Sequence, residues 1–420
     1  MSANARAALD AALAALLPQP RETLGLAVSG GGDSMALMVL LADWAEGRGM
    51  ALAAVTVDHG LRPEAAAEAA AVARQAAGLG ISHDILRWQG PAGAPGNLQD
   101  MARRARYRLI ADWAAGAGIG HVALGHTRDD LAETLLMRLA RGSGVDGLAA
   151  MAPLRRMHGV AFLRPLLDVS RAALRAELRR RGLAWVEDPS NNDPRFERVK
   201  ARRVLAALAP LGITAERLAR TAQHLATARA ALRGATAEAA QRLARVDAGG
   251  AVWLDPAGLA ELPEEIRLRL LAHALCWVST AEYRPRRDAL ERLAAGLAAG
   301  RGGTLHGCRA VRRRAGIGLL REPRAAEAAA PAAPDALWDG RWRFVGEAPA
   351  GAVVRALGAA GLAILPDTRR AGLPRDVLRA SPALWLGERL LAAPLVTEAE
   401  GPCAMLDPPG GSFAQAAIAH

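Results

Sequence analysis

The sequence predicts an α/β protein with a Rossmann-like parallel sheet, followed by a helical domain and a small α+β C-terminal domain. In the first half, short apolar runs alternate with segments of helical periodicity, and a glycine-rich turn follows the first run. Strands and helices that alternate at this length form parallel sheets covered on both faces. Such sheets bind ligands beyond the carboxyl ends of their strands.

Two strand–helix pairs open the predicted sheet. The apolar run at residues 24–28 predicts a strand, and helical periodicity follows over 34–45. A second apolar run covers 51–57 and ends in polar residues. The next helix is expected over 64–78, because Pro63 favours a helix start.

Two further pairs complete the sheet. Strands are expected over 83–88 and 121–125, and the helices that follow them over 99–115 and 129–141. Because the carboxyl ends of parallel strands share one edge, the polar segments after the strands should gather there. These segments are residues 29–34, 58–62 and 125–130.

The second half of the chain has a different organisation. Residues 206–324 follow an almost wholly helical pattern, and short strands are expected at 338–344 and 351–365. The run E-A-A-A-P-A-A-P between these parts is typical of a linker. The expected domains are an α/β domain (1–205), a helical domain (206–324), a linker (325–335) and a small C-terminal domain (336–420).

Positive charge is concentrated in one part of the chain. The net charge is +11, and residues 284–324 hold eleven arginines against three acidic residues, a local balance of +8. A face that only contacts solvent would carry charges of both signs. The excess of positive charge therefore predicts that this segment contacts a phosphate backbone. Lys200 is the one lysine beside 52 arginines, and a GC-rich coding sequence would produce the same bias.

Composition argues against several protein classes. Hydrophobic residues make up 51% and charged residues 23%, which is typical of a folded chain. Cys276, Cys308 and Cys403 form no C-x-x-C pair, so a zinc ribbon, a Cys-held cluster or a disulfide framework is not expected. Without a signal-peptide pattern or an apolar run near the ~18 residues of a membrane helix, a cytoplasmic location is expected.

The strongest local motif is S-G-G-G-D-S at residues 29–34, directly after a strand and before a helix. Glycines let the backbone approach a ligand, and a helix N-terminus offers N–H groups to an anion. Ser29 and Ser34 add hydroxyl donors, whereas Asp33 should meet a cation, which we assign to Mg²⁺. The motif lacks the lysine of a Walker A loop and the spacing of G-x-G-x-x-G.

This motif resembles the pyrophosphate loop S-G-G-x-D-S of the PP-loop ATP pyrophosphatases. That superfamily splits ATP between the α- and β-phosphates and transfers AMP to an oxygen, which activates a carbon for attack. The resemblance implies that residues 1–205 are a PP-loop catalytic domain that uses ATP. The implied ATP-binding residues are Ser29, Gly30, Gly31, Gly32, Asp33, Ser34, His59 and Arg62.

Further motifs narrow the resemblance. In chain order they are V-D-H-G-L-R (57–62), N-L-Q (97–99), A-R-R-A-R-Y (102–107), G-H-T-R-D-D (125–130), R-P-L-L (164–167) and E-D-P-S-N (187–191). As a set they resemble the tRNA(Ile)-lysidine synthetase family, and R-G-G-T-L (301–305) resembles its middle domain. The resemblance covers residues 20–325 and fades beyond. Val199 departs from it, because the family has asparagine there.

The resemblance implies a specific reaction on RNA. ATP adenylates the C2 carbonyl oxygen of the wobble cytidine in an isoleucine tRNA with the anticodon CAU. The ε-amine of lysine then attacks C2 and expels AMP, which forms lysidine. The implied cofactors and partners are ATP, Mg²⁺, free L-lysine and this tRNA, while a homodimer stays open. Residues 206–324 and the last domain are the expected contacts to the tRNA body.

Four residues are the catalytic candidates: Asp33, His59, Asp130 and Glu133. His59, together with Arg62, can reach the α-phosphate and stabilise charge there, unless it is a strand-end histidine without function. Asp130 and Glu133 lie one helical turn apart, and two carboxylates on one face suit the ammonium of lysine. Mg²⁺ binding and helix-start electrostatics stay open as alternatives. Asp129 is the weaker candidate of these acids.

Phosphate or tRNA contact is expected from Arg103, Arg106, His126, Arg198, Arg202, Arg301, Arg312 and Arg313. Arg103 and Arg106 share one helix face, as do Arg198 and Arg202, and a solvated face is the alternative for the first pair. Residues 188–191 could also simply cap a turn. The aromatic residues expected in the core are Tyr107, Trp338, Trp342 and Trp385.

Three other functions compete with this interpretation. A tRNA thiolase on the same fold is disfavoured, because thiolases of this type use C-x-x-C cysteines. A small-molecule amidating synthetase is disfavoured by the arginine-rich segment and by the missing glutaminase-like cysteine. A non-catalytic RNA-binding protein would keep the loop only as a scaffold, and it would release no AMP.

Overall fold

The computed structural model describes residues 3–17, 23–58, 60, 65–88, 90, 98–187, 193, 195–365, 372–396, 403–408 and 410–419. The chain divides into two compact units, Met1–Arg229 and Ala230–His420. Each unit has its own sheets and its own hydrophobic clusters. None of the helices in the described ranges is long and apolar enough to cross a membrane.

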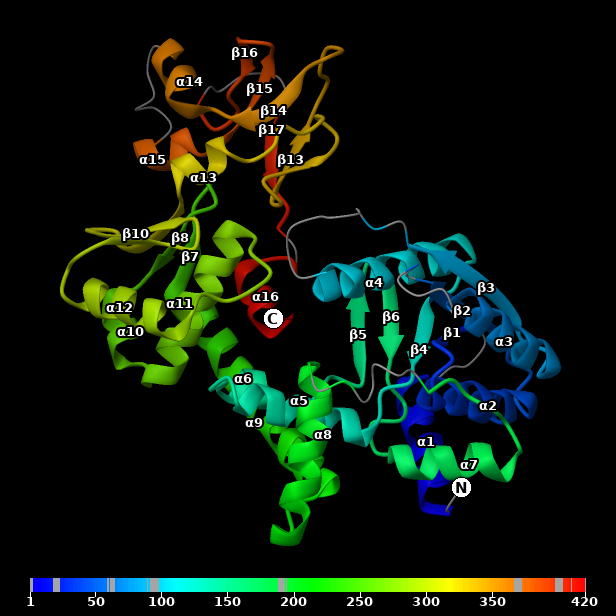
Figure 1. Cartoon of the computed structure of the whole chain (residues 1–420). Coiled ribbons are helices and arrows are strands. Elements are labelled where there is room, and N and C mark those ends of the chain that lie inside the picture. The colour runs from blue at the N-terminus through cyan, green and yellow to red at the C-terminus, as the bar shows by residue number, and fades with distance from the viewer. Residues whose placement is uncertain are drawn as a thin grey trace. The chain divides into compact units, whose positions relative to one another are not determined.

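The first unit contains the predicted parallel sheet, with the strand order β3-β2-β1-β4-β6-β5 (Figure 1). Its strands are β1 (Leu24–Ala27), β2 (Leu52–Asp58), β3 (Ser82–Arg87), β4 (His121–Leu124), β5 (Leu154–Met157) and β6 (Val160–Leu163). All neighbours pair in parallel except β5, which runs antiparallel to β6 at one edge. The four predicted strands are confirmed, and the β5–β6 hairpin is an addition to them.

Helices cover both faces of this sheet. The helices of the first unit before α9 are α1 (Ala3–Leu16), α2 (Gly32–Glu46), α3 (Ala65–Gly78), α4 (Leu98–Gly116), α5 (Arg128–Leu139), α6 (Val145–Leu148), α7 (Arg171–Arg180) and α8 (Glu197–Leu208). Residues of α1, α2, α3 and α7 share one hydrophobic cluster with β1, whereas α4 packs with β2, β4 and β6 on the opposite face. Tyr107 of α4 is buried there, edge-on to Phe162, as expected of a core residue.

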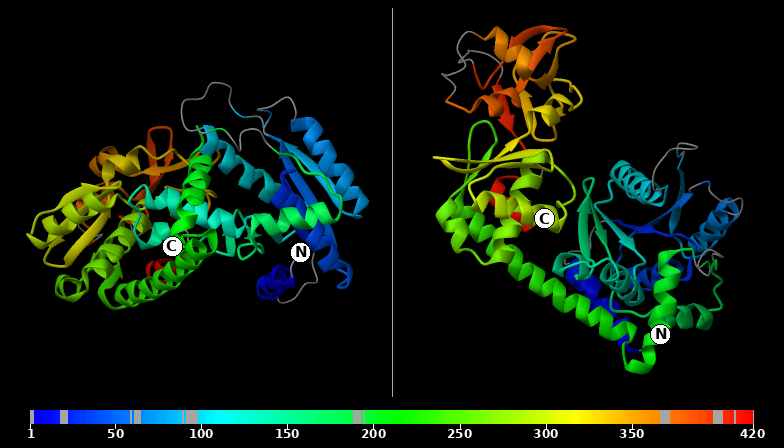
Figure 2. Two further views of the ribbon diagram at one scale, coloured as in Figure 1. Left: turned by 60° about the horizontal axis from the view of Figure 1, so that its bottom comes forward. Right: turned by 60° about the vertical axis from the view of Figure 1, so that its left-hand side comes forward.

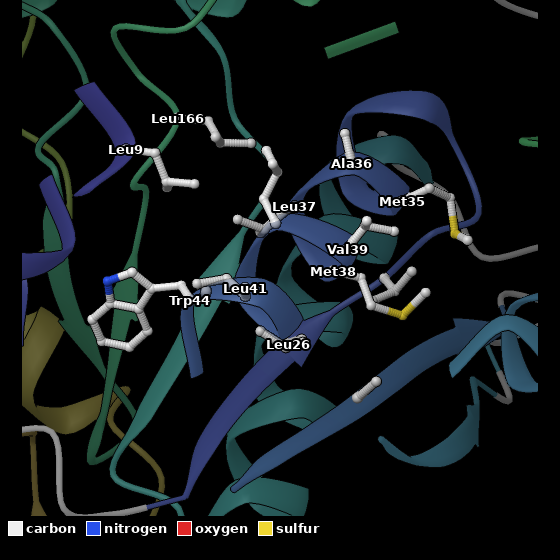
Figure 3. Packing of buried hydrophobic residues seen from close by; sticks show 14 of the residues in the cluster. Leu9, Leu26, Met35, Ala36, Leu37, Met38, Val39, Leu41, Trp44 and Leu166 are labelled. Carbon is white, nitrogen blue, oxygen red and sulfur yellow. The ribbon is translucent and has the colours of Figure 1, made fainter. Parts of the chain in front are cut away.

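Helix α2 is the centre of the larger cluster. Most of its side chains are apolar and buried, including Met35, Met38 and Trp44. Figure 3 shows them in one cluster with Leu9 of α1 and Leu26 of β1. This packing places the N-terminus of α2 at the carboxyl end of β1.

Ion pairs at its other end connect α2 to two neighbouring helices. Asp43 accepts hydrogen bonds from Arg181 Nη1 at 3.0 Å and from Arg6 Nη1 at 3.2 Å. Arg181, which follows α7, also binds Glu177 through Nε at 2.7 Å. These contacts lower the pKa of the Asp43 carboxyl group below 3.8, mainly through the hydrogen bonds from Arg181.

Asp43→Asn should therefore reduce the free energy of unfolding of the first unit, by about 1–2 kcal/mol at neutral pH. Since the folded-state pKa is lowered, the contribution of Asp43 is present above its unfolded pKa and is lost as pH falls through the folded pKa. Urea unfolding at pH 7 and pH 3 should show a difference between wild type and variant that shrinks at pH 3. An equal difference at both pH values would contradict this assignment.

The second unit begins within α9 (Ala215–Leu243) and continues with α10 (Pro256–Glu261), α11 (Glu264–Ser279) and α12 (Arg287–Ala298). It also holds an antiparallel sheet in the order β7-β8-β11-β10-β9. The strands are β7 (Ala244–Val246), β8 (Val252–Leu254), β9 (Gly303–Leu305), β10 (Cys308–Arg313) and β11 (Gly316–Arg321). The expectation of an almost wholly helical segment was wrong for these strands, which are short; β10 also carries three arginines.

Two three-stranded sheets follow in the same unit (Figure 2). They are formed by β12 (Leu337–Trp338), β13 (Trp342–Val345) and β17 (Cys403–Leu406), and by β14 (Val353–Ala356), β15 (Pro382–Leu386) and β16 (Arg389–Ala392). The helices are α13 (Pro323–Glu327), α14 (Gly358–Ile364), α15 (Arg375–Arg379) and α16 (Phe413–Ala419). Residues 351–365, expected as a strand, contain β14 and then α14. The tryptophans expected in the core are buried: Trp338, Trp342 and Trp385.

The segment 325–335, predicted as a linker, contains residues that pack against the last domain. Ala326 in α13 is fully buried against Trp338, and Ala332 forms a β-bridge with Val354. Further on, the ring of Phe413 in α16 packs against Trp277 of α11 at a centroid distance of 5.7 Å. The residues after the expected linker therefore complete the core of the preceding helices.

Candidate active site

The glycine-rich motif forms the turn from β1 into α2. Gly30 has φ of +83°, a conformation that favours glycine, and its carbonyl accepts a hydrogen bond from Val186 N–H at 2.9 Å. Ser34 Oγ accepts from Ser29 N–H at 3.1 Å and donates to the Gly31 carbonyl at 2.9 Å. Gly31 is the N-cap of α2 and has no side chain to satisfy the first-turn N–H groups. These groups are therefore suited to binding an anion.

Three carboxylates from two elements meet at one guanidinium. Arg171 donates from Nε to Asp33 Oδ2 at 3.0 Å, from Nη1 to Glu133 Oε1 at 2.7 Å and from Nη2 to Asp130 Oδ1 at 3.2 Å. The side chains of Glu133 and Asp130 are only 1% and 7% exposed. The nucleotide-type loop and the acidic face of α5 thus form one site, which we call the Arg171 cluster (Asp33, Asp130, Glu133 and Arg171).

The starts of α5 and α7 are built to hold this cluster. Thr127 caps α5, and its backbone N–H and Oγ1 both donate to Asp130 Oδ2, at 2.8 and 2.9 Å. Ser170 caps α7, and the backbone N–H of Arg171 donates to Asp129 Oδ2 at 2.8 Å. Asp129 therefore joins the two helix starts, which gives it a structural role.

The cluster shifts the ionisation of its acids in different directions. Burial raises the pKa of Asp33 above 3.8, although Arg171 opposes that effect. Burial also acts on Asp130, but Arg171, the Thr127 N–H and Arg198 together hold the pKa of its carboxyl group below 3.8. Asp130 is consequently a carboxylate at neutral pH, as a residue that binds a cation should be.

A pocket of about 360 Å³ opens beside the cluster. Its lining includes four charged residues, Asp129, Glu133, Arg171 and Arg202. The apolar residues of the lining are Leu205, Ala206, Ala209 and Ala215. Such a pocket suits a ligand that combines a charged group with an aliphatic chain.

Two carboxylate oxygens of the cluster stay available for a further cation. Asp33 Oδ1 and Glu133 Oε2 are buried and have no hydrogen-bond partner among the described residues. Mg²⁺ usually takes one or two protein carboxylates together with phosphate oxygens, so Asp33 fits the role of a magnesium ligand beside the loop. In the described part of the chain, no three His, Cys, Asp or Glu side chains converge as a complete metal site.

Comparison with known proteins identifies the family of this chain. Residues 3–208 match the model of the PP-loop domain family. The chain is 51% identical to a tRNA(Ile)-lysidine synthase of Ruegeria pomeroyi, over 96% of this chain and 95% of that protein. The chain belongs to the tRNA(Ile)-lysidine synthase family.

Two other similarities are weaker. A tRNA(Ile)-lysidine synthase of Bradyrhizobium is 49% identical over 61% of this synthase and 74% of that protein. Among solved structures, a U34-tRNA thiolase of Methanococcus maripaludis aligns with a TM-score of 0.47 and 16% identity, over 53% of this chain and 78% of that one. A likeness at that level carries no argument about function.

The predicted site residues of this synthase are brought together only in part. Asp33 and Asp130 meet at the sheet edge, as their segments were predicted to, and Glu133 joins them through Arg171. His59 and Arg62 lie outside the described residues, as do residues 188–191. Their roles at the phosphates therefore stay predictions. The arginines of the second unit, Arg301, Arg312 and Arg313, are exposed.

Arg198 and Arg202 of α8, which were predicted to contact phosphate, lie against acids of the Arg171 cluster in this structure. Arg202 Nε donates to Glu133 Oε1 at 2.8 Å, and Arg198 Nη1 lies 3.7 Å from Asp130 Oδ1. Both therefore neutralise the acids of the cluster in this structure. Val199, where the family has asparagine, is buried and packs as an apolar residue.

The remaining basic candidates lie around Tyr107 and β4. The guanidinium carbons of Arg103 and Arg106 lie 5.3 and 5.6 Å from the centre of the Tyr107 ring. Burial lowers the pKa of His126 to about 3, so this histidine is neutral at physiological pH. It could contact a phosphate only as a neutral hydrogen-bond donor.

Sequence reasoning missed Arg171, although one local feature marks it. The residue occupies the first helical position of α7, directly after the Ser170 cap. A cation is unfavourable at a helix N-terminus, where the helix dipole favours negative charge. An arginine in that position therefore indicates a specific acidic partner, and here it has three.

Proposed function

We propose that this synthase joins lysine to C2 of the wobble cytidine in an isoleucine tRNA with a CAU anticodon, with release of AMP and pyrophosphate. The observation that supports this most is the simultaneous binding of Arg171 to Asp33 in the nucleotide-type loop and to Asp130 and Glu133 in α5. Residues suited to ATP and residues suited to a cationic amine therefore share one site. The high identity to a named synthase over 96% of the chain supports the same reaction.

The loop serves the first step of this reaction. The C2 carbonyl oxygen of cytidine attacks the α-phosphorus of ATP, and the bond to the β-phosphate breaks as pyrophosphate leaves. We assign the pyrophosphate to the first-turn N–H groups of α2 and the hydroxyls of Ser29 and Ser34. Asp33 would hold Mg²⁺, which neutralises phosphate charge when bound.

The acidic face of α5 serves the second step. The neutral ε-amine of lysine attacks C2, the bond from C2 to the adenylated oxygen breaks, and AMP leaves with that oxygen while the nitrogen loses a proton. We assign the positioning of this amine to Glu133, which lines the pocket, and to the negative charge of Asp130 behind it. The aliphatic chain of lysine would lie along Leu205, Ala206 and Ala209.

The exposed arginines are the proposed contacts to the tRNA backbone. Arg312 and Arg313 lie at the end of β10, beside the turn into β11, and Arg301 is close to the start of β9. Phosphate contacts of this kind give affinity and register without reading sequence. A cytoplasmic location is a further prediction for this protein, while a homodimer stays open.

Arg313→Gln should weaken tRNA binding by about threefold to tenfold at physiological salt, and the slope of log K against log salt should fall by about one. Filter binding at several salt concentrations measures both quantities. Arg48→Gln, which removes the same charge at the exposed C-terminal end of α2, is the matched control and should change neither. Equal losses in the two variants would indicate a general charge effect rather than a contact.

The reaction itself is tested with purified protein, Mg-ATP, lysine and an unmodified CAU-anticodon isoleucine tRNA transcript. The tRNA is digested and analysed by mass spectrometry for lysine added to cytidine, while AMP and pyrophosphate are followed in parallel. A lysidine peak with one AMP per product supports the proposal. AMP release without lysidine would indicate another nucleophile or RNA, and a folded protein that forms neither product would overturn the enzymatic assignment.

A further inference from the structure

The hydrogen bonds of the Arg171 cluster leave few carboxylate oxygens for a substrate. Asp130 has both oxygens occupied, one by Arg171 and the other by Thr127. Glu133 Oε1 accepts from both Arg171 and Arg202. Asp129 Oδ2 is taken by the backbone N–H of Arg171. Each acid at the pocket therefore already has at least one oxygen engaged.

Arg171 occupies the positions that a second guanidinium would need. Its three donors each reach a different carboxylate, at 2.7, 3.0 and 3.2 Å. A guanidinium prefers to bind a carboxylate with two parallel hydrogen bonds to its two oxygens. Arg171 and Thr127 already bind oxygens of these carboxylates. No carboxylate of the cluster therefore offers two unoccupied oxygens to the guanidinium of a substrate.

The oxygen that remains for a substrate suits a different cation. Because Asp33 is assigned to Mg²⁺, this oxygen is Glu133 Oε2, which is buried and lacks a partner among the described residues. An ammonium is a compact charge with three donors that can each bind a single oxygen, so it does not need two oxygens on one carboxylate. The arrangement therefore fits the side-chain ammonium of lysine better than the guanidinium of arginine.

We propose that Arg171 is a specificity-determining residue, which makes this site accept an alkylammonium and reject an alkylguanidinium. The inference rests on the proposed function, because it assumes that the substrate amine enters at this cluster. Arg171 acts through the acids and the space it fills, and it does not touch the reacting atoms. Without its side chain, the same three carboxylates would form a good site for free arginine.

The test compares the binding of lysine and arginine by calorimetry to the wild type, Arg171→Ala and Arg175→Ala, each with the full chain and an ATP analogue present. The wild type should prefer lysine, and in Arg171→Ala that preference should fall at least tenfold because arginine gains affinity in the vacated space. Arg175 lies one turn further along α7, where it pairs with Glu187 at 3.6 Å, so its variant should keep the wild-type preference.

Several outcomes would overturn the inference. An Arg171→Ala protein that keeps the wild-type preference, or a wild type that binds arginine as well as lysine, excludes this role for Arg171. If Arg171→Ala does not fold, the wild type alone decides, because n-pentylamine should compete with lysine and n-pentylguanidine should not; equal competition rejects the proposal. A folded wild type that binds neither amino acid would instead reject the lysine assignment of the proposed function.

Discussion

Asp33→Asn is expected to abolish AMP formation, with a kcat lowered by about 10³-fold or more. The asparagine keeps the size of the side chain, and its carbonyl oxygen can still accept the hydrogen bond that Arg171 Nε donates at 3.0 Å. What the variant loses is the negative charge next to the nucleotide-type loop, which is the feature needed to hold a cation on the phosphates. AMP and pyrophosphate released from Mg-ATP with lysine and tRNA measure the effect.

The control for this variant is Glu46→Gln, which removes an exposed acid at the opposite end of the same helix. It should leave AMP formation within about twofold of the wild type, as is usual for surface substitutions away from specific features. Thermal unfolding checks that both variants keep the fold. A folded Asp33→Asn protein with normal AMP formation would remove Asp33 from the nucleotide site and with it our account of the loop.

The sheet of the first unit could be predicted because its signals are local. Strands β1, β2 and β4 are short, mostly apolar runs, and α2 follows its strand directly through a glycine turn, so the positions of Asp33 and Asp130 at one edge follow from chain order. The β5–β6 hairpin and the five-stranded sheet of the second unit were not predicted, although β6, β8 and β11 are apolar. Their strands are three to six residues long, and β10 places arginines where an apolar run would be expected.

The contacts that organise the site could not be predicted from spacing. Arg171 is 138 residues from Asp33 and 38 residues from Glu133 in the sequence, so no short motif contains both partners. The same holds for Arg202, which the periodicity of α8 places on a face but not against Glu133, 69 residues earlier. Periodicity identifies which residues share a helix face, whereas packing decides which other element that face meets.

Glu133→Gln is expected to raise the KM for lysine by about 10- to 100-fold while the KM for ATP changes by less than threefold, because charged hydrogen bonds of this kind contribute about 1.5–3 kcal/mol. Glu133 Oε1 accepts from Arg171 Nη1 at 2.7 Å and from Arg202 Nε at 2.8 Å. In the variant the site keeps both arginines but loses one negative charge, so a substrate ammonium meets net positive surroundings. Steady-state kinetics with each substrate varied in turn separates the two KM values.

The KM for lysine and the KM for ATP together show whether the carboxylates of Asp130 and Glu133 bind lysine or Mg²⁺. If Glu133 binds lysine, raising lysine restores the rate of Glu133→Gln and raising Mg²⁺ does not. If it binds Mg²⁺, the KM for ATP rises with that for lysine, and excess Mg²⁺ restores the rate. Asp112→Asn, an exposed acid on α4, controls for the loss of charge alone. Since Asp130 shares Arg171 with Glu133, its asparagine variant should follow the same pattern, with an added loss of stability because Asp130 also binds the Thr127 backbone at the start of α5.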